Sequence, residues 1–299
     1  MTGKPTIGWI GVGKMGLPMA VLAKQSGFDI RSYDRDEARL SLASAQGIQV
    51  ADSATAAATG RDIVLTSLPD DKALRGALFG SDGVIAAMSA DSVLIETSTV
   101  SAQVSADLAA LAKEKRIHYL RAPVSGNATI VHTGALTCFV SGPRPAFERV
   151  LSFLESFTRA QKYLGEAEEA RYAKLAVNLM IAVSAGMMAE SLALARKGGI
   201  AWQDILDVLD ESAIASPMVK YKTAPLRTRN FDSSFSCRQM AKDLDLILGA
   251  GHSVDVPLPL AAHMREVYGS LIAQGEGELD FIAPVRQAER LSGLDEPGK

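Results

Sequence analysis

Lys174 and Asn178 are the polar pair best placed to do chemistry, because they stand four residues apart in an otherwise apolar segment. In a helix, this spacing puts the ammonium and the carboxamide on one face, a turn apart. The apolar neighbours between Tyr172 and Met180 leave little solvent-facing surface, so we expect Lys174 to be partly desolvated, with a lowered pKa. Such a lysine can act as a general acid or base, and a buried Asn178 amide needs a hydrogen-bonding partner or a ligand.

A second candidate site is the loop RAPVSGNA at residues 121–128, which follows an expected strand. Open parallel sheets bind ligands at the carboxyl ends of their strands. Pro123 fixes the path of the chain, and Gly126 allows a ligand to approach the backbone. Ser125 and neighbouring backbone N–H groups could hold a carboxylate at this edge.

A third motif, GVGKMG at residues 11–16, places three glycines as G-x-G-x-x-G between an expected strand and an expected helix. Gly11 permits the tight turn, Gly13 leaves room for a pyrophosphate, and Gly16 lets the helix pack closely on the strand. The helix N-terminus then offers free N–H groups to the phosphates. A second strand ends at Asp34, where the acid that binds a nucleotide ribose is expected. The motif therefore predicts a dinucleotide site.

Short apolar strands alternate with helical crossovers after Asp34, which predicts a doubly wound parallel sheet of the Rossmann type. A helix over 143–158 and an edge strand over 162–164 close this domain, which we place at residues 1–164. The remaining strands are expected at 6–10, 28–33, 62–68, 92–96, 117–120 and 136–140.

The chain from 165 to 299 is expected to form an all-helical second domain that serves substrate binding and dimerisation. Its first helix, over 166–197, is unusually long. The run from Leu175 to Ala189 is apolar almost all round, but it is shorter than the ~20 residues that cross a membrane. A partner subunit is the natural cover for such a helix, so we expect a homodimer or homotetramer. Further helices are expected at 201–212, 239–250 and 259–274.

The composition excludes several classes of protein. With 299 residues, 47% of them hydrophobic, the chain is long enough for two cores, and its net charge of −3 argues against a nucleic-acid partner. The 2 cysteines and 4 histidines show no metal-ligand spacing. The first expected strand begins at Thr6 and leaves no room for a signal peptide, so we expect a cytoplasmic protein with no membrane partner.

At this point the order of the motifs resembles the β-hydroxyacid dehydrogenase family, which includes 3-hydroxyisobutyrate dehydrogenases and tartronate semialdehyde reductases. The resemblance runs from about residue 5 to residue 290 and rests on GVGKMGLPMA (11–20), Leu68-Pro69, Ser98-Thr99, APVSG (122–126), KLAVN (174–178) and Lys242-Asp-Leu244. It implies a Rossmann domain, a helical domain whose long helix packs in a dimer, and a small hydroxyacid or semialdehyde substrate.

The resemblance also implies roles for individual residues. Lys174 would be the catalytic acid/base, and Asn178 would help to position the substrate. The substrate would contact Ser125, Gly126 and Thr99, and Asn127, next to the presumed carboxylate site, is a further substrate-binding candidate from its own side chain. The NAD(P) cofactor would contact Gly11, Val12, Gly13, Lys14, Met15, Gly16, Asp34, Arg35, Leu68, Pro69, Thr99 and Lys242.

This chain departs from the family pattern where Arg121 replaces the usual acid and Asn127 replaces a second glycine. With His132 in the same loop, these changes suggest a larger, more polar or additionally anionic substrate, although a solvated loop histidine is the simpler interpretation of His132. For the cofactor, Asp34 would repel a 2′-phosphate, whereas Arg35 could pair with one. Since Asp34 holds the strand-end position, we expect NAD, with NADP possible.

Three alternatives stay open. Imine reductases resemble this chain but commonly lack a lysine at the position of Lys174. Oxidative decarboxylation of the 6-phosphogluconate kind uses a histidine where this chain has Val177, and it needs a longer helical domain. A cofactor-binding sensor without activity would not need the Lys174–Asn178 pair.

Overall fold

The computed structural model describes residues 3–294, which form two compact units that divide between Lys174 and Leu175. The division lies inside the long helix α8 (Glu169–Lys197), later in the chain than the boundary expected after residue 164. The first turns of α8 therefore pack with the first unit, and the remainder of this helix belongs to the second.

The first unit contains one nine-stranded sheet, and its strand order matches the expected doubly wound topology. The strands are β1 (Thr6–Ile10), β2 (Asp29–Tyr33), β3 (Gln49–Val50), β4 (Ile63–Thr66), β5 (Val93–Glu96), β6 (His118–Arg121), β7 (Val124–Ser125), β8 (Leu136–Ser141) and β9 (Thr158–Gly165). The order β3-β2-β1-β4-β5-β6 is parallel throughout, which brings the carboxyl ends of these strands to one edge.

The last strands depart from that pattern. β8 runs antiparallel to β6 and β7 and parallel to β9. The expected helix over 143–158 ends at Glu155, and β9 begins at Thr158 rather than at Lys162. Thr158 pairs with Leu136 of β8, and its buried hydroxyl donates to the Leu154 carbonyl at 2.7 Å. The chain therefore leaves the helix before Thr158 and pairs with β8 instead.

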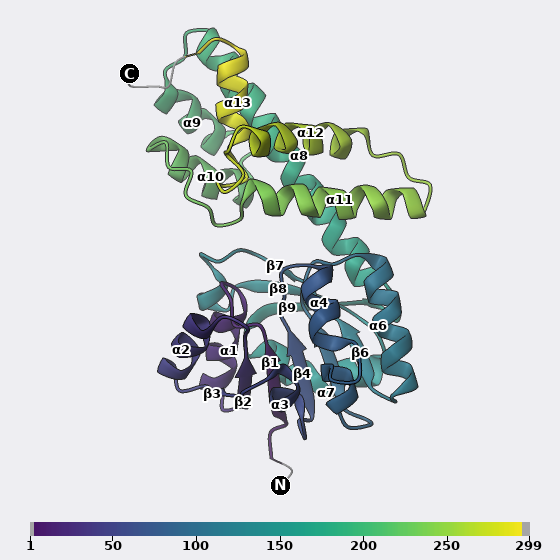
Figure 1. Cartoon of the computed structure of the whole chain (residues 1–299). Helices are drawn as coiled ribbons and strands as arrows, with labels where there is room; N and C mark the ends of the chain where they lie inside the picture. Colours follow the sequence, from purple (N-terminus) through teal and green to yellow (C-terminus); the bar gives the residue numbers. More distant parts are fainter. Residues whose placement is uncertain (1–2, 295–299) are drawn as a thin grey trace. The chain divides into compact units, whose positions relative to one another are not determined.

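Helices cover both faces of the sheet (Figure 1). They are α1 (Gly16–Gln25), α2 (Glu37–Ala45), α3 (Ala54–Ala58), α4 (Asp71–Leu78), α5 (Val84–Ala87), α6 (Ala102–Glu114), the 3-10 turn η1 (Val131–Thr133) and α7 (Arg144–Glu155). Alternate strand residues point to opposite faces. Leu65 of β4 packs in one core with α1 and α7, whereas its neighbour Val64 packs in a second core with α3 to α6.

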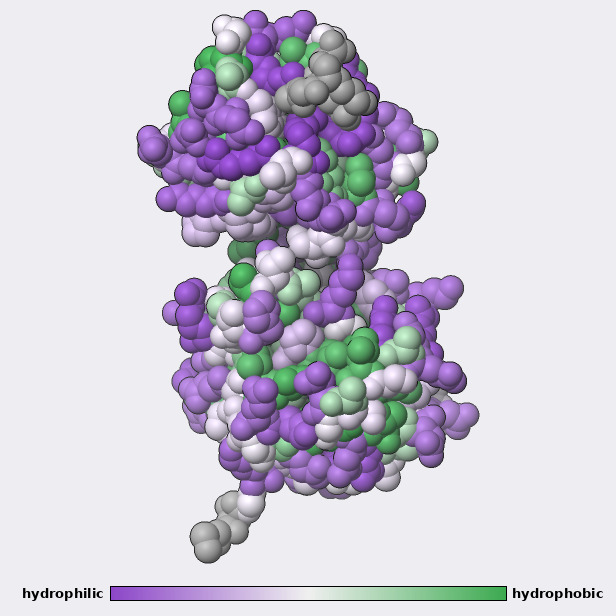
Figure 2. Space-filling view, turned by 90° about the vertical axis from the view of Figure 1, so that its left-hand side faces the viewer, coloured by the Kyte–Doolittle hydropathy of each residue, from purple (hydrophilic) through white to green (hydrophobic). Residues whose placement is uncertain are grey.

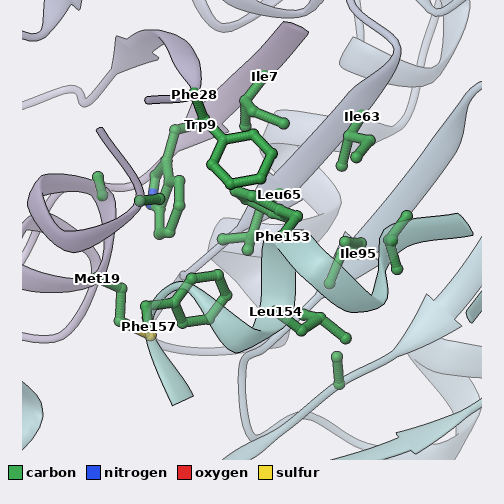
Figure 3. Packing of buried hydrophobic residues seen from close by; sticks show 14 of the residues in the cluster. Ile7, Trp9, Met19, Phe28, Ile63, Leu65, Ile95, Phe153, Leu154 and Phe157 are labelled. Carbon is green, nitrogen blue, oxygen red and sulfur yellow. The ribbon is translucent and has the colours of Figure 1, made fainter. Parts of the chain in front are cut away.

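An aromatic cluster fills the centre of the first of these cores (Figure 3). Phe153 of α7 is fully buried, and its ring meets Trp9, Phe28 and Phe157 edge to face, with centroids 6.1, 5.2 and 5.3 Å away. Such contacts add to the hydrophobic gain from burying large rings. Trp9 directly precedes the end of β1, so this packing also anchors the strand that leads into the glycine-rich loop.

The second unit is all-helical among the described residues, as expected. It comprises most of α8 with α9 (Trp202–Glu211), α10 (Pro217–Arg227), α11 (Cys237–Ser253), α12 (Pro259–Ala273) and α13 (Pro284–Leu291). Helix α10 was not among the predicted helices. It contains Pro225 near its C-terminal end, where a proline usually argues against a helix.

The surface of both units is mainly hydrophilic on the face drawn in Figure 2, with a group of hydrophobic residues on the first unit. Scattered apolar residues on a surface are normal. A more regular set lies on α8, where the exposed fractions of Met180, Met187 and Leu194 are 71%, 58% and 75%. By length and composition alone α8 could cross a membrane, but Leu175, Ala182 and other residues of its opposite face belong to the core of the second unit.

Candidate active site

The glycine-rich loop joins β1 to α1 and has the geometry of a phosphate cradle. Gly11 has a φ of +96°, and a Cβ there would lie 2.3 Å from the Ser67 carbonyl oxygen. A Cβ at Gly16 would lie 2.0 Å from the Gly11 carbonyl oxygen, so the close start of α1 also requires glycine. At Gly13 a Cβ would meet only the Arg39 side chain, at 3.5 Å. The loop therefore keeps open space at the middle glycine, where a pyrophosphate needs it.

These differences predict opposite outcomes for two matched substitutions. We expect Gly11→Ala to destabilise the first unit, because it combines a positive φ with a clash against backbone. Gly13→Ala should fold with almost unchanged stability and lose affinity for NADH, because its methyl group occupies the cradle. Thermal melts and NADH titration by fluorescence measure the two effects, and a Gly13→Ala variant that binds NADH normally would contradict this assignment.

Asp34 directly follows β2 beside this loop and is 6% exposed. Its Oδ2 accepts a hydrogen bond from the Val12 N–H at 3.0 Å, and its Oδ1 accepts one from the Asp36 N–H at 3.1 Å. Arg39 of α2 lies 3.6 Å from the same carboxylate, a contact that the sequence did not suggest. Arg35 is exposed. The residues present thus fit a dinucleotide: open space for the phosphates and a fixed carboxylate for the ribose.

Two turns at the carboxyl edge, Leu68-Pro69 after β4 and Ser98-Thr99 after β5, are tied together. The Leu68 N–H donates to the Ser98 hydroxyl at 2.8 Å. The Thr97 hydroxyl donates to the Thr66 carbonyl at 2.7 Å. The two turns, which the family resemblance assigns to the cofactor, are therefore held together by hydrogen bonds.

The loop after β6 holds Ser125 in the short strand β7, where it pairs with Thr137 of β8. Gly126 has a φ of +139°, and a Cβ there would lie 2.3 Å from a Leu136 methyl group. The Asn127 Oδ1 accepts bonds from the Thr129 N–H and hydroxyl at 3.0 and 2.5 Å. Because its oxygen is engaged, Asn127 could serve a ligand only through its amide nitrogen. His132 is exposed in η1.

Lys174 lies on α8 within the first unit, and its side chain is partly buried. The helix around it is less enclosed than expected, since Tyr172 is 38% exposed and Ala176 is exposed as well. Arg171, one turn earlier, donates from Nη1 to the Ser98 carbonyl at 3.1 Å. The helical turn that carries Lys174 is therefore anchored beside the Ser98-Thr99 turn.

Asn178 follows on α8 and is 5% exposed within the second unit. Its Nδ2 donates to Asp243 Oδ2 at 2.6 Å, which supplies the partner that a buried amide needs. Asp243, on α11, is 1% exposed and also pairs with the Lys242 ammonium at 2.9 Å. The sequence assigned no role to Asp243, although it stands in the Lys242-Asp-Leu motif. It fixes the Asn178 amide so that the carbonyl oxygen Oδ1 is the atom left for other partners.

Arg121, the departure from the family pattern, turns inward instead of toward a ligand. It is 6% exposed, donates from Nε to Glu168 at 2.8 Å, and stacks over the Tyr119 ring at 4.5 Å. Its charge is neutralised inside the first unit. The expectation that this change signals an additionally anionic substrate therefore loses one of its supports.

Comparisons with known proteins identify the family of this chain. Residues 6–165 match the model of the NAD binding domain of 6-phosphogluconate dehydrogenase, and residues 169–288 match that of the NAD-binding region of NADP-dependent 3-hydroxyisobutyrate dehydrogenase. The 2-(hydroxymethyl)glutarate dehydrogenase of Eubacterium barkeri is 30% identical over 293 residues, which cover 98% of this chain and 97% of that protein. The chain belongs to the β-hydroxyacid dehydrogenase family.

Solved structures of β-hydroxyacid dehydrogenases extend the likeness to three dimensions. A Mycobacterium tuberculosis 3-hydroxyisobutyrate dehydrogenase with L-serine is 29% identical, with a TM-score of 0.86 over 95% of this chain and 99% of that one. A Salmonella typhimurium 3-hydroxyisobutyrate dehydrogenase is 25% identical, with a TM-score of 0.87 over 95% and 100%. An imine reductase from Pseudomonas sp. is 18% identical, with a TM-score of 0.61 over 96% of this chain and 99% of that one, and shares the fold. As a member of this family the protein is an NAD(P)-dependent oxidoreductase.

Proposed function

We propose that this enzyme transfers a hydride between a nicotinamide cofactor and a short β-hydroxyacid or its semialdehyde, with Lys174 as general acid and base. One observation carries most weight: Arg171 bonds the Ser98 carbonyl, so the helical turn of Lys174 is fixed beside the Ser98-Thr99 turn, whose Thr99 the family resemblance assigns to cofactor and substrate. Ser125 and Gly126 lie after β6 at the same edge of the sheet. These residues for proton transfer, cofactor contact and carboxylate binding thus all belong to the first unit.

Each residue then has a defined task. NAD(P), when bound, supplies the hydride acceptor or donor. In the oxidative direction the Lys174 amine removes the proton from the substrate hydroxyl, and in the reductive direction its ammonium returns that proton to the carbonyl oxygen. Ser125 and the backbone at Gly126 hold the substrate carboxylate. Asn178, oriented by Asp243, supports the substrate through Oδ1.

An absorbance screen at about 340 nm, where reduced nicotinamide absorbs, tests this proposal. NAD and NADP are offered with 3-hydroxyisobutyrate, 3-hydroxypropionate, serine, glycerate, threonate and sulfonated analogues. Turnover with any of these acids supports the dehydrogenase and begins to name its substrate. Activity confined to cyclic imines with reduced cofactor favours an imine reductase, and NADH binding without any turnover favours a sensor.

We infer a preference for NAD over NADP from the position of Asp34. Its carboxylate is held by two backbone N–H groups, so it cannot easily withdraw from a 2′-phosphate. Two like charges about 4 Å apart repel by roughly 1–4 kcal/mol, which is at least several-fold in relative affinity. Arg39 and Arg35 oppose this effect without removing the carboxylate. Relative kcat/KM for the two cofactors measures the preference, and Asp34→Ser should shift it toward NADP; a wild-type enzyme that prefers NADP refutes the inference.

We also infer a homodimer in which a second copy covers α8. The exposed residues Met180, Met187 and Leu194 recur every seven residues on this helix. Leu194 also lines an apolar groove of about 510 Å³ between α8, α12 and α13, together with residues such as Met264 and Leu291. Stable dimers bury apolar surface of this kind. Light scattering should give twice the monomer mass, and Met187→Glu should lower it. Lys113→Glu, at an exposed position on α6 outside this groove, should not change the mass; a monomeric wild type excludes the dimer.

A further inference from the structure

Two buried side chains next to the candidate active site, Arg171 and Glu96, take no part themselves in the proton and hydride transfer proposed above. Arg171 is 2% exposed and Glu96 is fully buried, and they form an ion pair between α8 and the end of β5. Burying two charges costs desolvation energy that their attraction need not repay, and apolar pairs are often as stable. The pair is therefore weak evidence for stability, and its geometry points to a different use.

Glu96 and Arg171 both hydrogen-bond the backbone of one residue, Ser98. Glu96 Oε1 accepts from the Ser98 N–H at 2.5 Å, and Arg171 Nη1 donates to the Ser98 carbonyl at 3.1 Å. The Ser98 hydroxyl meanwhile accepts from the Leu68 N–H. Ser98 thus has its N–H, carbonyl and hydroxyl all engaged, which fixes the backbone that leads directly into Thr99.

The same guanidinium also fixes the helix. Arg171 Nη2 donates to the Tyr119 hydroxyl at 2.8 Å, in addition to its bond with Glu96. Burial lowers the pKa of Arg171, but the neighbouring Tyr119 and Glu96 more than offset this and raise it, so the guanidinium stays charged at every working pH. Lys174 stands three residues later on α8, about one turn along.

A second ion pair backs the first. Glu168, which directly precedes α8, bonds Arg121 and lies 3.7 Å from Arg171 Nε. Two cations and two carboxylates therefore alternate through the cluster, with balanced charge. Arg121, which departs from the family pattern, is one of the two cations of this cluster.

We propose that Arg171, with Glu96, is a positioning residue that sets the place of Lys174 relative to the Ser98-Thr99 turn. The inference rests on the proposed role of Lys174. A misplacement of about 1 Å between reacting groups can cost on the order of 100-fold in rate, so rigid anchoring of both segments by one side chain has a direct catalytic effect.

Arg171→Lys tests the proposal, because a lysine keeps the charge but cannot form the same fork of bonds to three partners. We expect kcat to fall by about 10- to 100-fold, with the NADH dissociation constant and the substrate KM little changed. Glu96→Gln, which retains the shape of the side chain, should act in the same direction and serves if Arg171→Lys folds poorly. Arg196→Lys is the matched control, since Arg196 lies at the far end of α8 and forms its ion pair with Glu289 of α13.

A readout that does not depend on turnover is the rate at which Lys174 is acetylated, followed by peptide mass spectrometry across a pH series. In Arg171→Lys the dependence of the acetylation rate on pH should change for Lys174 and stay the same for Lys197. A lower melting temperature with unchanged kcat and an unchanged Lys174 profile would mean that Arg171 is merely structural, and would overturn the proposal. If the wild type turns over no hydroxyacid, the proposed function fails, and the acetylation profile alone then decides whether Arg171 positions Lys174.

Discussion

Replacing Lys174 by alanine is expected to lower kcat by about 10²–10⁴-fold, because the proton of the substrate hydroxyl then has no positioned acceptor. The cofactor site should survive, since the glycine-rich loop and Asp34 belong to β1, α1 and β2. NADH titration should therefore give a dissociation constant close to that of the wild type. Steady-state rates at saturating cofactor, with the best hydroxyacid of the panel, measure the loss.

Two variants show whether that loss comes from proton transfer. Lys174→Arg keeps a positive charge that does not deprotonate at working pH, so it should be nearly as inactive as the alanine variant. Lys197→Ala removes an exposed lysine from the end of the same helix and should leave kcat unchanged. A Lys174→Ala enzyme that retains most of its activity would remove Lys174 from the mechanism.

Phe153→Ala should destabilise the first unit by about 3–5 kcal/mol, as truncation of a buried aromatic side chain does. Phe153 is fully buried and shares edge-to-face contacts with Trp9, Phe28 and Phe157, as Figure 3 shows. The rigid backbones of β1 and α7 cannot close the cavity fully. Denaturant unfolding followed by tryptophan fluorescence reports the change, because Trp9 lies in the same cluster.

Ser152→Ala is the matched control for this prediction. Ser152 precedes Phe153 on α7 but is exposed, so its truncation should change stability by no more than about 0.5 kcal/mol. Since the chain has two compact units, the unfolding curve is fitted for two transitions, and Phe153→Ala should move only one of them. Equal shifts of both transitions, or an effect no larger than that of Ser152→Ala, would contradict the packing account.

The fold could be predicted where short apolar runs alternate with helical segments. β1, β2, β4 and β5 stand within a residue or two of their expected positions. Elements whose formation depends on distant partners were missed or displaced. Ser125 forms a strand only because β8 supplies its partner, and Thr158 starts β9 for the same reason. α10 carries an internal proline, so local signals argued against it.

In the candidate site, too, residues in local patterns could be predicted and residues that depend on distant partners could not. Glycines, a strand-end acid and a lysine in an apolar helix are local patterns with physical meaning, and they identified the main motifs. Asp243 and Glu96 were overlooked because their roles depend on contacts with Asn178 and Arg171, far away in the sequence. The role of Arg121 was likewise not predictable, because Glu168, which neutralises its charge, is 47 residues away in the sequence. Long-range pairing of charges leaves no signature in the spacing of residues along a chain.

The most direct test of the central claim follows a deuterium label. The hydroxyacid that performs best in the screen is prepared with deuterium on the carbon that bears the hydroxyl group, and is incubated with NAD and the enzyme. Mass spectrometry of the reduced cofactor should find the label on the nicotinamide ring, because that carbon gives up its hydrogen as hydride while Lys174 takes the hydroxyl proton. Reduced cofactor without the label, or no reduction with any acid of the panel, would contradict the account.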